Sequence, residues 1–369
     1  MNVHLSSPDI TSKEIDMVTS VISGRTLSMG PMVEKFESLV ADYLGVKNAV
    51  AVNSGTSGLH LCVRALGIGK GDEVITTPFS FVASSNCLLY EQAIPVFVDI
   101  DPLTLNLDVN LIEEKITKRT KAILPVHVFG HPVEMDKILK MAGKYGLAVI
   151  EDACEALGAR YQDRLAGSEG DVSVFAFYPN KQITTGEGGV IATGDERIAS
   201  LCRSMRNQGR GSSGAWLEHQ ILGYNYRMSE LNAALGVAQM ERLDEILEKR
   251  RRVASAYDAR LSPVDGVILP YVAPGVQMSW FVYVVRFSEG IDRNRIMHFM
   301  QERGVDCRPY FQPLHLQPLY RDLFDYREGD FPICEHEANH TLALPFFNNL
   351  SIDKIDYVVE TLEQAIKSI

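Results

Sequence analysis

The sequence lacks both a long apolar run and an excess of positive charge. No apolar stretch in the 369 residues reaches the roughly 18 that a membrane-spanning helix needs, so we expect no membrane association. The 36 Lys and Arg residues against 47 Asp and Glu give a formal net charge of −11. Because nucleic-acid-binding proteins usually carry a basic excess, no nucleic-acid partner is expected. A small anionic ligand remains possible, since it needs only a few local cations.

Cysteine is sparse and scattered. None of the six cysteines belongs to a CxxC pair, which argues against a zinc site and a disulfide framework. The first residues show no basic start followed by an apolar core, so we expect no signal peptide and a cytoplasmic protein with reduced thiols. No cluster of His and Asp at ligand spacing accompanies the acidic pair at 151–152, and no metal is expected.

What the sequence does contain is a series of short apolar runs separated by turns and helical stretches. This alternation predicts an α/β domain with a mostly parallel sheet sandwiched by helices, whose ligands bind at the carboxyl ends of the strands. Helices are expected over 33–45 and 134–145 and after the turn at 54–58. The expected strands are 49–53, 73–77, 95–99, 122–127, 147–152, 172–176 and 188–194.

The pattern changes after about residue 230. Residues 229–261 read as one very long helix or two helices in tandem, and 279–287 alternate like a half-buried strand. Helices are expected over 293–304 and 352–369. A chain of this length also favours two domains. We therefore predict a large α/β domain at 1–240 and a small α+β domain at 241–369.

The first feature with chemical meaning is the turn NSGTSG at 53–58, between a predicted strand and a predicted helix. Free backbone N–H groups and the helix dipole at such a turn can bind an anion, and Gly allows close approach. An ordinary N-cap turn is the alternative, because Ser and Thr are preferred caps.

The second feature is Asp152, at the end of the predicted strand 147–152. A carboxylate there points toward the expected ligand crevice. Next to a pyridine nitrogen it would keep that nitrogen protonated and make the ring a better electron acceptor. The alternative is a cap for the following helix.

The third feature is Lys181, within FYPNKQITTGEGG at 177–189. A lone Lys is usually a solvated surface charge, but this one lies among apolar and aromatic residues and is followed by a Gly-rich segment. Shelter from water favours the neutral amine, which is the form that makes a Schiff base. The segment GYNYRMSE at 223–230 is the fourth feature, and there Ser229 could simply cap the long helix.

In their order and spacing these motifs resemble those of the DegT/StrS-type sugar aminotransferases, a branch of the fold-type I pyridoxal-phosphate enzymes. The resemblance covers essentially the whole chain. It rests on NSGTSGLHL, TPFSFVAS, PVHVFGHPVEMD, VIEDACEALGA, GDVSVFAFYPNKQITTGEGG, GYNYRMSELNAALG and CRPYFQPLHLQPLY.

The resemblance implies a role for several residues. Lys181 matches the Schiff-base lysine, which also acts as the general base, and Asp152 matches the partner of the pyridinium nitrogen. Phe81 matches the aromatic residue that stacks on the pyridine ring. Asn225 matches a phosphate contact from the other subunit, which implies a homodimer with shared active sites.

The resemblance also assigns the cofactor phosphate to the turn with Ser54, Gly55 and Thr56. Two positions depart from the family pattern. Ala176 stands where many relatives carry a phosphate-binding Ser, so Thr56 and Asn225 would have to carry more of the binding. Glu155 stands near the cofactor's ring hydroxyl where many relatives carry Gln or His, and a carboxylate there is unfavourable unless it is protonated or turned away.

The implied reaction is a ping-pong transamination from an amino acid, best guessed as L-glutamate, to a nucleotide-linked ketosugar, best guessed as a 4-keto-6-deoxyhexose. A cyclitol or other non-nucleotide ketone is an alternative acceptor. A related sugar dehydratase is a further alternative, but those enzymes carry His in place of the lysine, and this chain has Lys181. A non-catalytic regulatory protein could share the fold, but the presence of both Lys181 and Asp152 argues against it. The candidate substrate contacts are Tyr178, Arg308, Tyr310 and His315.

Overall fold

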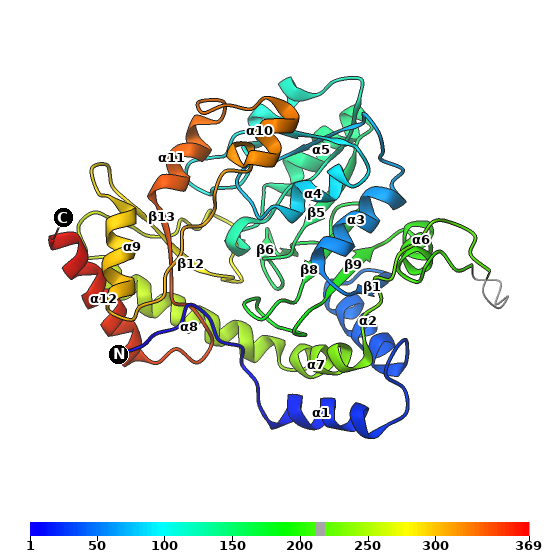
Figure 1. Cartoon of the computed structure of the whole chain (residues 1–369), viewed down its shortest axis with the longest axis horizontal. Helices are drawn as coiled ribbons and strands as arrows, with labels where there is room; N and C mark the ends of the chain where they lie inside the picture. The colour runs from blue at the N-terminus through cyan, green and yellow to red at the C-terminus, as the bar shows by residue number, and fades with distance from the viewer. Residues whose placement is uncertain (212–217, 369) are drawn as a thin grey trace.

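The computed structural model describes residues 1–211 and 218–368. A seven-stranded sheet in the order β1-β9-β8-β5-β4-β2-β3 forms its centre (Figure 1). Strand β9 runs antiparallel to both neighbours, and the pairs from β8 to β3 are parallel, which confirms the mostly parallel sheet. The strands are β1 (Asn48–Val52), β2 (Glu73–Thr76), β3 (Ile94–Phe97), β4 (Thr120–Ile123), β5 (Ala148–Asp152), β8 (Val172–Ala176) and β9 (Gly189–Thr193).

Helices cover both faces of this sheet because successive side chains of each strand point to opposite sides. Val50 of β1 joins the core on one side of the sheet, and Ala51 joins the core on the other. The first face is covered by α3 (Gly55–Ala65), α4 (Ala83–Leu89) and α6 (Glu196–Arg206). The second is covered by α2 (Pro31–Leu44), α5 (Met135–Tyr145) and α7 (Glu230–Met240).

The C-terminal part builds a second core around the three-stranded sheet β10-β12-β13. Its elements are β10 (Val267–Ile268), β12 (Tyr283–Phe287), β13 (Thr341–Leu344), α8 (Leu243–Leu261), α9 (Arg293–Glu302) and α12 (Ile352–Lys367). The expected half-buried strand at 279–287 is wrong in two respects, since β12 begins at Tyr283 and is buried on both faces. The reason is that Val284 packs into the first core while Val285 packs into the second.

The segment of the chain between β12 and β13 packs against the first core. Tyr320 and Phe331 pack there against Phe97, within a segment that contains α10 (Pro318–Phe324) and α11 (Pro332–His340). A small sheet of β11 (Val276–Gln277), β6 (Arg160–Tyr161) and β7 (Arg164–Leu165) also joins distant segments. The domain boundary at residue 240 stays a prediction.

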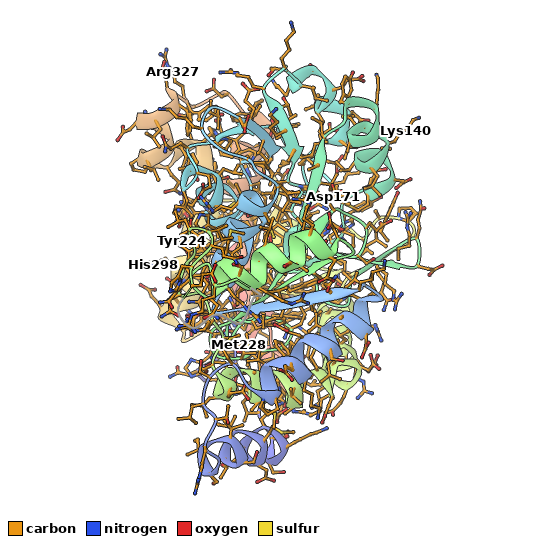
Figure 2. All side chains as sticks on the ribbon, turned by 90° about the vertical axis from the view of Figure 1, so that its right-hand side faces the viewer. Lys140, Asp171, Tyr224, Met228, His298 and Arg327 are labelled. Atoms are coloured by element: carbon orange, nitrogen blue, oxygen red, sulfur yellow. The ribbon has the colours of Figure 1, made fainter. Side chains whose placement is uncertain are left out.

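The helices agree with the prediction at one place and depart from it at another. The long helical stretch is two helices in tandem, because α7 ends at Met240 and α8 begins at Leu243. Helix α1 (Ser12–Ser23) was not predicted, although Thr11 and Glu14 form a capping box at its start. It lies at the edge of the molecule outside α2 and α7, as both views show (Figures 1 and 2). None of the described helices has the length and apolar character needed to cross a membrane.

Candidate active site

A pocket of about 580 Å³ opens where the carboxyl ends of β5 and β8 meet the start of α3. This is where a parallel sheet is expected to place its ligand. The structure brings most of the predicted site residues together here, although they come from distant parts of the sequence. Those that line the pocket are Ser54, Gly55, Thr56, Phe81, Asp152, Glu155, Tyr178, Lys181 and Tyr310.

The start of α3 forms one wall of the pocket and suits an anion. The Ser54 side chain caps the helix by accepting the Ser57 N–H at 3.1 Å, which leaves the first amides, those of Gly55 and Thr56, for a ligand. A Cβ at Gly55 would lie 2.8 Å from the Cβ of Ala176, so only glycine lets the turn lie this close to β8. The start of α3 therefore has the N-cap and also offers free amides for an anion, so the two interpretations of this turn are compatible.

Asp152 enters the pocket because strand alternation turns its neighbour Glu151 to the other face of the sheet. Its Oδ2 accepts the Ser84 hydroxyl at 2.7 Å, and its Oδ1 accepts the Cys154 N–H at 3.1 Å. Ser84 in turn lies 2.8 Å from the hydroxyl of Ser80. No role was predicted for these two serines, although both lie in the motif TPFSFVAS.

Replacing Ser84 by Ala should lower turnover by roughly tenfold or more, because a hydrogen bond to a charged group contributes about 1.5–3 kcal/mol. The hydroxyl is buried and holds the carboxylate of Asp152 in one orientation. Ser84→Thr keeps the donor and should restore most of the activity. Steady-state kcat values of the three proteins measure this effect, and a Thr variant as impaired as the Ala variant would show that packing alone explains the loss.

Lys181 also lines the pocket, with its amine sheltered. Its side chain is 13% exposed, and Nζ lies 3.5 Å from Oε1 of Glu155 and 3.8 Å from the ring centroid of Phe281. The Glu155 carboxyl is also buried, and its Oε2 accepts the Phe129 N–H at 2.9 Å. Burial raises the pKa of Glu155, against the opposing effect of the Lys181 amine. A raised pKa favours the neutral carboxyl, which suits a position beside an oxyanion.

Two further residues that the sequence did not indicate belong to this pocket. Phe281 comes from the segment before β12, and its carbonyl accepts a 2.7 Å hydrogen bond from the buried Arg250 of α8. Asn180 lines the pocket, and its buried Oδ1 has no partner among the described residues. A buried acceptor of this kind is usually satisfied by a ligand or by water. In the sequence, only the position of Asn180 next to Lys181 indicated that it belongs to the site.

Three predicted residues do not line the pocket. Asn225 is exposed and pairs through its backbone with Asn207, and Arg308 is exposed beside the pocket-lining Pro309. His315 is fully buried, with Nε2 2.8 Å from Glu335. The short 3-10 turn at Leu314–Leu316 directs the imidazole inward, so we no longer expect His315 to contact the substrate.

The residues present fit pyridoxal phosphate. Its phosphate suits the α3 amides, its ring nitrogen suits Asp152, and its aldehyde suits the sheltered amine of Lys181. Phe81 lines the same pocket and offers an aromatic face for the ring.

Comparison with known proteins agrees with this geometry. The chain is 40% identical over 368 residues to GDP-perosamine synthase of Caulobacter vibrioides, covering 99% of this chain and 98% of the relative. Its structure matches Helicobacter pylori PseC, an aminotransferase involved in the biosynthesis of pseudoaminic acid, with a TM-score of 0.96, 28% identity and full coverage of both chains. It also matches the PLP form of the putative sugar aminotransferase Spr1654 of Streptococcus pneumoniae, with a TM-score of 0.95, 26% identity and coverage of 100% and 99%.

The profile of the DegT/DnrJ/EryC1/StrS aminotransferase family matches residues 8–363. The fold, the pocket chemistry and these relatives agree, and the chain belongs to this family as a pyridoxal-phosphate-dependent aminotransferase.

Proposed function

We propose that the enzyme transfers an amino group from L-glutamate to the ketone of a nucleotide-linked ketosugar, with a 4-keto-6-deoxyhexose as the best single candidate. The observation that carries the proposal is the convergence of Lys181, Asp152 and the start of α3 on one pocket. The name of the Caulobacter relative, a GDP-perosamine synthase, supports a nucleotide-linked acceptor. A cytoplasmic location, where such an activated sugar would be met, is part of the proposal.

Pyridoxal phosphate, when bound, supplies an aldehyde that links to amines and a ring that accepts an electron pair from the adjacent carbon. The amine of Lys181 would hold the cofactor through its aldehyde and, once displaced by the amino-acid donor, would act as the base that takes the Cα proton. Asp152 would keep the ring nitrogen protonated, and Phe81 would cover one face of the ring. With the ketosugar bound, Lys181 moves the proton in the opposite direction.

We also propose that the enzyme works as a homodimer with shared active sites. Phe81 and Tyr178 line the pocket but are 62% and 53% exposed in the single chain, so the pocket is open on one side. Large apolar side chains of α1 are exposed as well, with Ile15 at 59% and Ile22 at 62%. A second copy would cover such surfaces and bring its Asn225 to this pocket.

The acceptor is tested by assaying a panel of nucleotide-linked 3-keto and 4-keto sugars with L-glutamate as donor, with a cyclitol ketone as the matched comparison. We expect a kcat/KM for one nucleotide-linked sugar that exceeds the value for the cyclitol by at least about 100-fold, since specific polar contacts in a pocket discriminate by this much or more. Turnover of the cyclitol alone would favour the alternative acceptor. Amino transfer to neither class would support a regulatory role on the same fold.

A further inference from the structure

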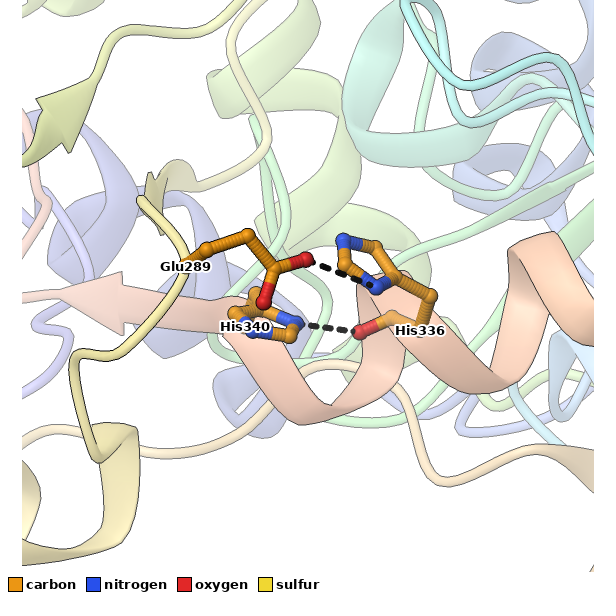
Figure 3. Close-up of side chains that lie close together, drawn as sticks. All are labelled: Glu289, His336 and His340. Atoms are coloured by element: carbon orange, nitrogen blue, oxygen red, sulfur yellow. Dashed lines mark hydrogen bonds and ion pairs between the residues drawn. The ribbon is translucent and has the colours of Figure 1, made fainter.

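Two histidines and a glutamate from separate elements face one another on the surface of the C-terminal part (Figure 3). His336 and His340 lie on α11, and Glu289 lies in the turn that follows β12. One ligand atom from each residue lies within 4.8 Å of the other two. Within residues 1–211 and 218–368 this is the one such group of three, and none of its members lines the cofactor pocket.

The arrangement of the two histidines suits a shared metal. Residues four apart on a helix lie on the same face, and the two rings stack with centroids 4.2 Å apart. Glu289 Oε1 lies 3.7 Å from Nδ1 of His336. Zinc takes imidazole nitrogen and carboxylate oxygen at about 2.0–2.2 Å. Small rotations of these side chains, two of them exposed, would bring the three donors to that distance.

Two further observations favour a cation here. Nδ1 of His340 lies 2.7 Å from the backbone oxygen of His336, and a ring N–H donated there leaves Nε2 free as a ligand (Figure 3). Metal-binding histidines commonly donate their second N–H to such a group, which fixes the tautomer. Helix α11 also ends at His340, and the carboxyl end of a helix carries a partial negative charge.

We infer that Glu289, His336 and His340 bind one zinc ion, with water completing the coordination. The ion links the turn after β12 to α11, and the ion pair between Arg286 of β12 and Glu337 of α11 joins the same two elements. The lack of CxxC pairs and of a His and Asp cluster near residues 151–152 predicted no metal, and only the fold places Glu289 beside His336 and His340. This inference does not depend on the identity of the sugar acceptor.

The test is calorimetric titration of the tag-free holoenzyme with zinc chloride in a buffer that does not chelate metals. We expect one zinc ion per chain and a higher thermal midpoint in its presence. His336→Ala and His340→Ala should each weaken binding by at least about tenfold, since loss even of a group that only supports a ligand costs 10–100-fold. His298→Ala is the matched control, because His298 on α9 (Figure 2) is also exposed and pairs with Glu302, but belongs to no group of three candidate metal ligands among the described residues.

Three measurements make the result decisive. Thermal midpoints without zinc show whether each variant is folded, and the visible absorption of the holoenzyme shows whether zinc disturbs the cofactor. Transamination should be unchanged in both α11 variants. The inference is overturned if the folded wild type binds no zinc in the micromolar range, or if the α11 variants bind it as tightly as His298→Ala does.

Discussion

Replacing Lys181 by Ala should abolish the visible absorption of the lysine-bound cofactor and lower transamination by at least about 10⁴-fold. In the proposed function the variant loses both the amine that links to the cofactor and the base that moves the Cα proton, and general base catalysis alone contributes about 10²–10⁴-fold. The amine is sheltered between Glu155 and Phe281, and this environment suits both roles. Absorption spectra and single-turnover rates with L-glutamate measure the two losses separately.

Borohydride reduction of the wild-type holoenzyme gives an independent readout of the attachment site. Peptide mapping should find the reduced cofactor on Lys181. Lys140→Ala is the matched control, because Lys140 is a solvated lysine of α5 at the surface (Figure 2) and its loss should leave the spectrum and the rate unchanged. A label on a different lysine, or an unchanged spectrum of Lys181→Ala, would remove the basis of the assignment.

The second large effect is expected for Asp152→Asn, which should lower turnover by roughly 10²–10³-fold, as is usual when an electrostatic contact to the developing charge is lost. The amide has the shape of the carboxylate and can still accept the Ser84 hydroxyl, so the fold should persist. It carries no charge, however, and cannot hold the ring nitrogen protonated. The loss should shrink as the pH falls, because the solution then supplies that proton.

Asp171→Asn provides the control for the loss of one negative charge. Asp171 directly precedes β8, at the end of that strand opposite to the pocket, and it accepts the Val149 N–H at 2.8 Å. It should keep normal turnover at every pH. Near-normal activity of Asp152→Asn, or a loss that does not depend on pH, would show that the carboxylate is not the partner of the ring nitrogen.

Local signals allowed much of the fold to be predicted. The seven strands of the central sheet were found because each is a short apolar run bounded by turns, and all seven lie within a few residues of their expected bounds. Helix α1 was missed even though its capping box is visible, and of its residues only Glu14 and Val21 are buried. The burial of β12 on both faces could not be foreseen, since the alternation of its own side chains does not show that a second core covers it.

The residues of the candidate site also differ in whether a local sequence signal indicated them. The start of α3 and Asp152 lie at strand ends, and Lys181 lies in the turn that follows β8. Such places have local sequence signals. Ser84 and Phe281 have no such signal for their roles, because their contacts to Asp152 and Lys181 join distant segments. His315 lies in a recognisable motif, yet its imidazole turns inward to Glu335.

By itself the sequence determined the alternation of strands and helices, the family, and the two charged groups that we propose carry the chemistry, because backbone periodicity and strand ends are properties of short segments. Only the tertiary structure decided which side chains shelter and orient those groups, and which distant residues meet at the surface as Glu289 and His336 do. The physical reason is that burial and hydrogen-bond partners depend on the packing of segments far apart in the chain, which no local pattern encodes.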